Sequence, residues 1–449
     1  MDLKLKQKEF ILNGNIKQVM WKLSLPAIIA MVMFGLNAFM DTVYIGQLMS
    51  EEALSGVALA YPLTSITFGL GSWAGTGAGN LLSIAIGKKD TNKQQLILSN
   101  ATFLMLVSTL IFTIPTFIYS DELIKLMGGS GIITTYGSDY LKTTLLAAPF
   151  WVYGLGLNFI VRAEGRMKTA AIMMIYGLVI NLILTPILIK YADLGVEGAA
   201  WATNIGMVIY CLVGYLYFKM GKASFKVNIN AIGFQKEIFS DILKSGFPGF
   251  IMALMSLIQS IVVLNAIANY GTSSDLAFFA SANRILMFLM TPLFGLMRAL
   301  QPVVGINYGA RNYERIKNSF KLFTKTGLLF VLPFWILLTL FPEQSLRLML
   351  PDATFSSLNI LHFRVYVVVL PFLPLVFMAL TYFPAIENPK PASIIALARQ
   401  LFFYIPLMIL LPKWWGIGGV YYGSTLIDVV ITIWILILIV KSFKKLNQT

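Results

Sequence analysis

The sequence predicts an all-α polytopic membrane protein with twelve transmembrane helices, arranged as two parallel repeats of six. The first observation is composition: 57% of the 449 residues are hydrophobic and only 12% are charged, whereas a soluble domain has about 25% charged residues. The second is a series of twelve long apolar runs, and the third is a set of motifs that recur about 222 residues apart. These observations override the two or three soluble domains that length alone would suggest.

Each apolar run is long enough for a transmembrane helix, which needs about 20 mostly apolar residues. The runs are 20–46, 52–84, 96–118, 136–160, 169–190, 197–219, 247–269, 277–305, 322–342, 360–383, 393–412 and 417–440. The second and eighth exceed one crossing, so we expect these helices to tilt or to extend beyond the bilayer. The longest polar interval, 220–245, predicts an N-terminal lobe of residues 1–222 and a C-terminal lobe of residues 223–449.

The distribution of Lys and Arg predicts the orientation of the chain. Twelve spans place both termini on one side, and the intervals on that side hold 26 of the 34 basic residues, against six on the other. Because basic residues concentrate in cytoplasmic loops, we expect a multi-pass protein of the plasma membrane with both termini in the cytoplasm. The formal net charge of +14 then reflects the direction of insertion and does not indicate a nucleic-acid partner.

Residue types that commonly carry catalytic or metal chemistry are scarce. The single cysteine, Cys211, excludes a disulfide framework and a Cys-based zinc site, and the single histidine, His362, argues against a His-ligated metal centre. The sequence also contains no P-loop. We therefore expect no metal site and no organic cofactor, and we do not expect an enzyme.

The N-terminal segment is basic and amphipathic. It combines Lys4, Lys6 and Lys8 with apolar neighbours, but it has no continuous apolar core before a small-residue cleavage site. We therefore do not expect a cleaved signal peptide. Two interpretations remain open, an amphipathic helix on the membrane surface and a soluble tail.

Four motifs repeat in chain order at nearly one offset. The matching pairs are 25–26 with 247–248, 86–90 with 308–312, 168–170 with 390–392, and 195–198 with 416–419, at offsets of 222 or 221 residues. Because each repeat has an even number of spans, both repeats insert the same way round. They should be related by an axis along the membrane normal, with a cavity between them. This arrangement is typical of transporters.

Several segments together resemble the multidrug and toxic compound extrusion (MATE) family of secondary exporters, over essentially the whole chain. The segments are MDTVYIG at 40–46, RAEG at 162–165, NLILTP at 181–186, GVEGAAWAT at 195–203, QPVVGINYGARN at 301–312 and RQ at 399–400. Each is weak alone, but their order and spacing are specific. The resemblance implies two six-helix lobes that form a V-shaped cleft, and cation-coupled export by alternating access.

The resemblance also implies a coupling site in the N-terminal lobe. One branch of the family builds it from an Asp on the first helix, an Asn and a second Asp on the fifth, and a Thr on the sixth. Asp41, Asn181 and Thr203 match this pattern, whereas Thr185 stands where the second Asp would be. Another branch uses carboxylates on the seventh and tenth helices, but the runs 247–269 and 360–383 contain no Asp or Glu.

Asp41 is a candidate functional residue even without the family resemblance, because it lies inside an apolar run near the predicted extracellular end. A carboxylate at mid-bilayer costs roughly 2.5–3.5 kcal/mol, so one that persists there usually faces a cavity or a partner. The alternative is an interfacial Asp that caps the helix end. Pro26 lies fifteen residues earlier in the same run and permits a bend. It therefore either couples protonation of Asp41 to helix shape or forms a static kink.

Four charged residues are assigned to the predicted membrane interior: Asp41, Asp428, Arg284 and Arg298. Asp428 is either a structural partner of Arg284 or Arg298, because unpaired buried charges are costly, or a functional group. If Arg298 instead lines the cleft, it favours anionic or zwitterionic substrate groups.

Our main hypothesis is a cation-coupled antiporter that exports amphipathic organic compounds, with a proton favoured over sodium as the coupling ion. A single carboxylate with Asn and Thr oxygens could serve either ion. The alternative is a flippase for a lipid-linked or anionic amphiphile, which Arg284 and Arg298 would suit, although a flippase predicts more basic residues in the cleft. As partners we expect a small organic substrate and the lipid bilayer, no nucleic acid, and a monomeric protein.

Overall fold

The structure, a computed structural model, describes residues 3–226, 228–350 and 354–448, and confirms the predicted all-α fold: this part of the chain forms helices and short connections without a strand. The helices of the first half are α1 (Leu3–Asn13), α2 (Ile16–Leu48), α3 (Glu51–Lys88), α4 (Thr91–Ile118), α5 (Ser120–Leu126), α6 (Ile132–Leu146), α7 (Ala148–Ala163), α8 (Met167–Pro186), η1 (Ile187–Tyr191) and α9 (Gly195–Lys219). Those of the second half are α10 (Lys236–Tyr270), α11 (Ser273–Gly309), α12 (Tyr313–Leu340), α13 (Pro342–Arg347), α14 (Ser357–Val367), η2 (Leu370–Phe372), α15 (Leu373–Ala385), α16 (Lys390–Leu397), η3 (Ala398–Tyr404), α17 (Ile405–Trp415) and α18 (Gly418–Leu446).

All twelve predicted apolar runs fall on helical segments. Among the described residues, ten helices are long and apolar enough to cross a membrane, and α6 with α7 form an eleventh span if this pair, bent by 54°, is counted as one. The bend has a local cause, because Pro149 in the first turn of α7 has no N–H to continue the helix from α6. The remaining run, 247–269, lies within α10, and some of its side chains lie outside the described part.

The predicted internal repeat is visible in the backbone. Lys89 and Arg311, which are 222 positions apart, both adopt the left-handed conformation with φ 59°. Gly165 and Glu387 form a second pair with positive φ, at the same offset. A positive φ is uncommon for residues other than Gly, so the same strained turn at the same place indicates that both halves use one chain path.

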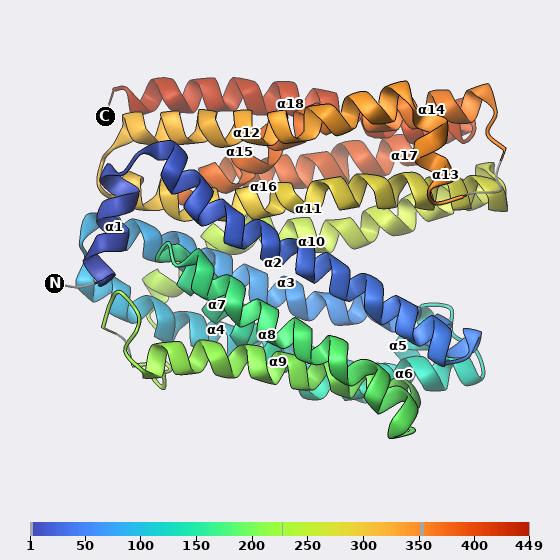
Figure 1. Ribbon diagram of the computed structural model, residues 1–449, viewed down its shortest axis with the longest axis horizontal. Coiled ribbons are helices and arrows are strands. Elements are labelled where there is room, and N and C mark those ends of the chain that lie inside the picture. Colours follow the sequence, from blue (N-terminus) through green and yellow to red (C-terminus); the bar gives the residue numbers. More distant parts are fainter. Residues whose placement is uncertain (1–2, 227, 351–353, 449) are drawn as a thin grey trace.

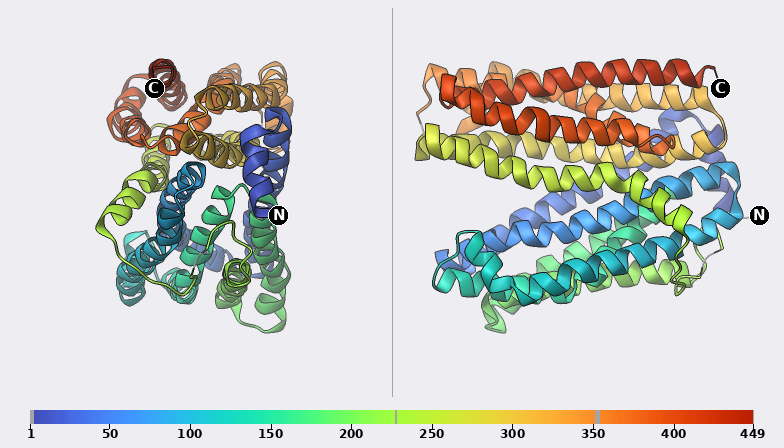
Figure 2. Two further views of the ribbon diagram at one scale, coloured as in Figure 1. Left: turned by 90° about the vertical axis from the view of Figure 1, so that its left-hand side faces the viewer. Right: turned by 180° about the vertical axis from the view of Figure 1, so that it is seen from behind.

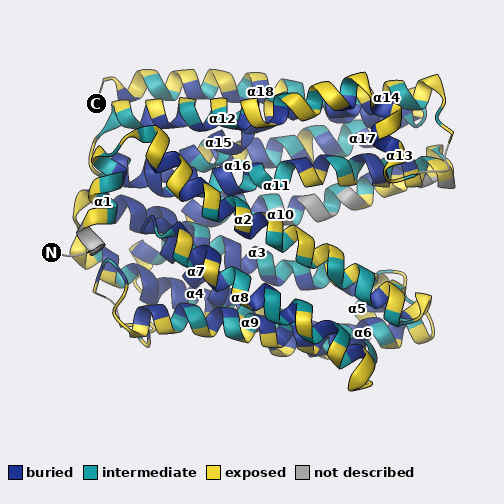
Figure 3. Ribbon diagram, in the orientation of Figure 1, coloured by how far each residue is buried: buried dark blue, intermediate teal, exposed yellow. Residues whose placement is uncertain are grey.

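The two halves lie side by side along the bundle and diverge toward one end (Figures 1 and 2). Both termini lie at the other end, which we call the terminal end (Figure 1). The main contacts between halves are made by α3 with α10 and α11 and by α2 with α11. Consistent with this central position, α3 is buried along much of its length toward the terminal end (Figure 3).

Glycines allow the halves to touch through their backbones. A Cβ on Gly77 of α3 would lie 2.1 Å from the carbonyl oxygen of Ile242, and a Cβ on Gly87 would lie 2.2 Å from that of Ile306. The converse holds for Gly309, whose Cβ would lie 2.1 Å from the carbonyl oxygen of Ile84. Gly87 and Gly309 are repeat equivalents that contact each other, so the pseudo-twofold axis passes between them. No larger residue fits at these positions without separating the halves.

The N-terminal helix α1 packs against the rest of the protein, which contradicts a free soluble tail, whereas its position relative to the membrane surface stays a prediction. Its Ile11 is fully buried against the protein. Lys8 Nζ donates to the carbonyl oxygen of Ile86 at 2.6 Å, and Arg315 of α12 donates from Nε to that of Ile11 at 2.9 Å and from its terminal nitrogen to that of Gly14. Helix α1 is therefore held by hydrogen bonds to both halves at the terminal end.

Glu164, which follows α7, is buried although it carries a carboxyl group. It accepts hydrogen bonds from the backbone N–H of Ser224 and from Tyr217 Oη, at 3.3 Å for the latter. Burial raises the pKa of Glu164 to about 7. Through the hydrogen bond from Ser224, this carboxyl group connects the turn between α7 and α8 to the segment that joins the two halves.

We expect Arg315→Ala to loosen α1. Hydrogen bonds from a charged donor contribute roughly 1.5–3 kcal/mol each when well shielded, and half-buried Arg315 should deliver the lower end of that range. Amide hydrogen exchange in residues 6–14 should then accelerate about tenfold or more. Lys321→Ala, at an exposed position of the same helix, is the control. Unchanged exchange in Arg315→Ala would show that α1 is held by other contacts.

The buried Glu164 should give stability a pH dependence. Because its pKa is about 7 in the folded protein and about 4.3 in an unfolded chain, the folded state binds the extra proton between these values. Its contribution is full at pH 4 and is lost as the pH rises through 7, by on the order of 3 kcal/mol. Thermal unfolding of Glu164→Gln in detergent should show a shallower decline over this range than wild type, and parallel curves would contradict the assignment.

Candidate functional site

The structure places Asp41 in a polar cluster between α2, α8 and α9. Asn37, one helical turn earlier on α2, donates from Nδ2 to Asp41 Oδ2 at 3.0 Å. Asn181 of α8 is buried beside them, and oriented so that both ends of its amide are satisfied, it donates to Asp41 Oδ1 at 3.1 Å while its oxygen accepts from Thr203 Oγ1 of α9 at 3.1 Å. The carboxylate therefore receives two hydrogen bonds from amide groups.

Thr185 completes the cluster from the next turn of α8. It is buried, its hydroxyl donates to the carbonyl oxygen of Asn181 at 2.9 Å, and its side chain is close enough to the Asp41 carboxylate to interact with it. The structure thus brings together all four residues that the sequence singled out for cation coupling. It adds Asn37, which sequence analysis missed although its spacing of four from Asp41 places both on one helix face.

The backbone contact of α8 with α9 explains why these side chains meet. A Cβ on Gly177 would lie 2.7 Å from the carbonyl oxygen of Gly206, and a Cβ on Gly206 would lie 2.6 Å from that of Gly177. Gly177 is one turn before Asn181, and Gly206 is about one turn after Thr203. The absence of side chains at these two positions lets Asn181 reach across to Thr203.

The cluster offers one charged oxygen group among neutral oxygens and amides. Such a set suits a single proton on the carboxylate, or a monovalent cation with amide and hydroxyl oxygens as further ligands. Tyr61 and Tyr140 are titratable side chains that lie close enough to Asp41 to interact with its charge. Because Thr185 cannot ionise, the cluster cannot take up a second proton on a second carboxylate.

An aromatic pocket lies toward the terminal end from Asp41. Its lining residues come from α2, α3, α7, α8, α9 and α11: Phe34, Phe68, Trp151, Leu155, Met174, Gly177, Leu178, Met207, Tyr210 and Arg298. The rings of Phe34 and Phe68 stack with centroids 6.1 Å apart. The pocket shares α2 and α8 with the Asp41 cluster, because Phe34 is two turns before Asp41 and Leu178 is one turn before Asn181.

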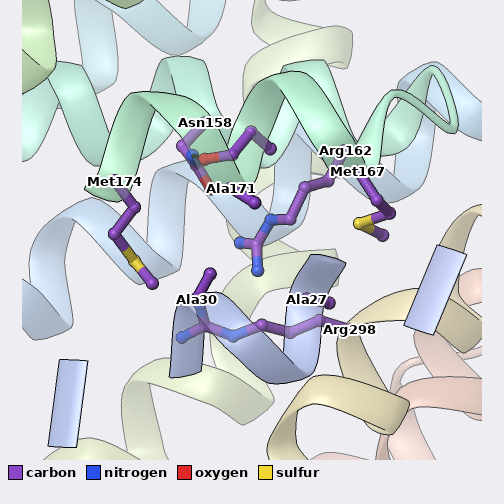
Figure 4. A pocket seen from close by; sticks show the side chains of 9 residues that line it. Ala27, Ala30, Asn158, Arg162, Met167, Ala171, Met174 and Arg298 are labelled. Atoms are coloured by element: carbon purple, nitrogen blue, oxygen red, sulfur yellow. Dashed lines mark hydrogen bonds between the residues drawn. The ribbon is translucent and has the colours of Figure 1, made fainter. Parts of the chain in front are cut away.

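A second, smaller pocket adjoins the first and contains two arginines. Arg298 and Met174 line both pockets, and Arg162 points into the smaller one (Figure 4). Arg162 was expected in the polar interval after the fourth run, yet it lies in the last turn of α7 and is 4% exposed. Its guanidinium group packs on the ring of Phe159, 3.8 Å from the centroid.

Asp428 pairs with neither of the predicted partners. Arg399 donates from Nε to Asp428 Oδ1 at 2.7 Å. Arg399 was counted with the basic residues of the cytoplasmic side although it falls inside the predicted run 393–412, and η3, the π-helical stretch that contains it, lies within the span Lys390–Trp415. Arg298 lines the pockets instead, and Arg284 is exposed. Neither of these two arginines forms an ion pair with a described residue.

Pro26 lies within α2, which is helical without interruption over Ile16–Leu48. The residues that follow it, Ala27 and Ala30, line the two-arginine pocket, and the Cα of Ile28 would lie 2.6 Å from a Cβ on Gly295 of α11. Pro26 therefore sits beside the contact between halves, at the far end of α2 from Asp41. Its role in bending stays a prediction.

Comparison with known proteins gives evidence about the family of this chain that is independent of the site geometry. A family model, MatE, matches residues 26–187 and 248–410. The multidrug export protein MepA of Staphylococcus aureus (strain NCTC 8325 / PS 47) is 30% identical over 330 residues, 73% of each chain. Among solved structures, an outward-facing multidrug resistance MATE family transporter superposes with a TM-score of 0.89 at 25% identity, covering 98% of each chain. A MATE structure in the bent conformation reaches 0.92 at 24% identity, covering 100% of this chain and 99% of the other.

We expect Asp428→Asn to destabilise the protein, because it leaves Arg399 without its counter-ion. Truncating one partner of a buried pair costs roughly 3–5 kcal/mol, and partial exposure of this pair should place it at the lower end. The double variant Asp428→Asn, Arg399→Met should recover much of the loss in thermal unfolding. Glu343→Gln, which breaks the exposed pair of Glu343 with Arg347, should cost less than about 1 kcal/mol. Equal losses in the two single variants would contradict a shielded pair.

Proposed function

This chain belongs to the MatE family, and from that membership and the geometry around Asp41 we propose that it is a cation-coupled antiporter. It exports amphipathic organic compounds by alternating access, and the coupling ion is a proton in preference to sodium. Support from the family comes from MepA, which is a multidrug export protein. The observation that carries the proposal is the Asp41 cluster. Its single carboxylate lies on α2 and accepts hydrogen bonds from two amides, and α2 also lines the aromatic pocket.

A proton on Asp41 changes what its neighbours bind. The ionised carboxylate accepts from Asn37 and Asn181, and these charge-assisted bonds are stronger than those to a neutral acid. Protonation weakens them and so loosens α2 from α8. Because Phe34 and Leu178 of the same two helices line the aromatic pocket, a shift between these helices alters the pocket. Ion binding and substrate binding are coupled through this shift, to the extent that the two states differ in affinity for each.

The free energy released when a proton enters the cell is large enough to drive export without a further energy source. One proton that crosses a potential of 100 mV releases about 2.3 kcal/mol, and one pH unit adds about 1.4 kcal/mol. Together they sustain a substrate gradient of roughly a few hundredfold at one proton per substrate. The coupling ion is then the only cofactor, and sodium remains the second possibility at the same carboxylate.

The excess of basic residues on the terminal side, 26 against six, supports a plasma-membrane protein with both termini in the cytoplasm. Arg162 and Arg399 lie within spans and are therefore removed from the 26 basic residues of the terminal side. The excess over the opposite side remains without them. The remaining parts of the proposal are a monomer whose partners are an organic substrate and the bilayer, with no nucleic acid.

A second candidate function is a flippase for a lipid-linked or anionic amphiphile. The observation that favours it is the pair of arginines, buried Arg162 and partly buried Arg298, at the boundary between the halves. A phosphate headgroup would neutralise them. The two candidates differ in their driving force, since a flippase that equilibrates lipid needs no ion gradient.

The test is flux in proteoliposomes under an imposed pH gradient or an imposed sodium gradient, with ethidium and dansyl-phenylalanine as probes. We expect a pH gradient to drive transport of at least one probe in wild type. Asp41→Asn should lower the rate at least tenfold, because a neutral amide cannot carry the proton. The matched control is Asp193→Asn, which makes the same change at an exposed residue with φ 53°, a conformation that Asn tolerates.

Equal transport by wild type and Asp41→Asn would reject Asp41 as the coupling residue. Transport driven by sodium alone, with no response to the pH gradient, would reject the proton. Gradient-independent movement of a fluorescent phosphatidylglycerol, with neither soluble probe transported, would favour the flippase.

A further inference from the structure

Two arginines from opposite halves, one buried and one partly buried, line one pocket without an acid between them. Arg162 belongs to α7, and Arg298 belongs to α11 (Figure 4). None of the three guanidinium nitrogens of Arg162 has a hydrogen-bond partner among the described residues. The ion pairs of this part of the chain involve neither arginine.

A third donor lies at the same place. Tyr210 of α9 is 4% exposed, and its hydroxyl has no hydrogen-bond partner in the described part of the chain. It lines the aromatic pocket together with Arg298. Arginine carries five N–H donors and no acceptor, and the tyrosine hydroxyl can donate. The converging groups thus offer positive charge and hydrogen-bond donors, the complement of an oxyanion.

Two acids could be considered as counter-ions of these arginines, but both already accept hydrogen bonds from other groups. Glu164, two residues after Arg162, accepts from Ser224 and Tyr217. Asp41 accepts from Asn37 and Asn181. A charge held in a protein interior without a counter-ion is costly, and ionisable groups kept inside membrane proteins commonly mark substrate pathways. No described acid forms an ion pair with Arg162 or Arg298, so an anionic ligand is a natural counter-charge for them.

We propose that this pocket binds the anionic group of the exported compound, and that the substrates are amphipathic organic anions and zwitterions. The inference rests on the proposed export function and specifies its substrate class. A carboxylate, sulfonate or phosphate lies between Arg162 and Arg298, which can each bind two oxygens. The apolar or aromatic body lies in the adjoining pocket walled by Phe34, Phe68 and Trp151, because that pocket shares Arg298 and Met174 with the first.

The pocket as it stands has room for about one water molecule, with a volume of about 10 Å³. Met167 and Met174 line it, and their flexible side chains can move to admit the larger headgroup. A bound anion bridges the two halves, since it contacts α7 and α11 together. Without it, the two like charges repel. The ligand therefore stabilises the arrangement in which the arginines are close.

The test compares two probes that share one aromatic body and differ at the carboxyl group, the anionic dansyl-phenylalanine and its uncharged methyl ester. Fluorescence anisotropy measures their Kd for the full-length protein in phosphatidylcholine nanodiscs, with no ion gradient. We expect the acid to bind wild type at least tenfold more tightly than the ester. Arg298→Gln and Arg162→Gln should each weaken acid binding about tenfold and leave the Kd of the ester unchanged, which also shows that the aromatic pocket is intact. Arg298→Lys should retain part of the preference.

The matched control is Arg284→Gln, which removes the same charge from an exposed position of the same helix and should bind both probes as wild type does. Equal binding of acid and ester by wild type overturns the proposal, and this comparison requires no variant to fold. An acid preference that survives in both glutamine variants also overturns it. Nanodiscs with phosphatidylglycerol should leave acid binding unchanged, whereas its loss would assign the pocket to a lipid headgroup. Failure here with intact gradient-driven flux would leave the antiport proposal standing.

Discussion

The backbone contact of α3 with α10 and α11 is the constraint on which the rest of the structure depends. Gly87 and Gly309 meet on the pseudo-twofold axis, and Gly77 approaches the backbone of Ile242. Atoms this close leave no room for side chains, so the halves are held together at the terminal end and diverge from there (Figure 1). The two-arginine pocket lies beside the contact of α2 with α11, the aromatic pocket adjoins it, and the Asp41 cluster lies beyond, within the first half. Any motion about the glycine contact therefore changes the arginine pair more directly than the Asp41 cluster.

The buried charges divide according to whether the chain neutralises them. Asp428 has Arg399 as its counter-ion within the second half. Asp41 has amide donors but no cation, and Arg162 and Arg298 have no acid. A buried charge without a counter-ion in the protein keeps an uncompensated desolvation free energy. A bound ion or ligand of opposite charge would offset it. On this reasoning we propose that Asp41 takes the coupling ion and that the arginines take the anionic substrate.

Much of the fold follows from the sequence, because a bilayer permits few solutions for a spanning chain. Apolar runs locate the helices, and motifs at an offset of 222 identify the repeat. The candidate coupling residues Asp41, Asn181, Thr185 and Thr203 were singled out by family resemblance and meet in space as a cluster. The placement of basic residues outside the membrane was less reliable. Arg162 follows the predicted run 136–160 but lies in the last turn of α7, and Arg399 was counted with the cytoplasmic side although it lies inside a span.

The sequence by itself determined which segments cross the membrane, the twofold repeat and the presence of a lone acid in the first span, because hydrophobic length and motif spacing are one-dimensional properties. Only the tertiary structure decided the partners of the buried charges. It paired Asp428 with Arg399, set Arg162 opposite Arg298 (Figure 4), and placed α1 against both halves. Counting charges in the interior cannot predict these partners, since Coulomb attraction depends on distance, and distances between helices are set by packing and by where glycines let backbones touch.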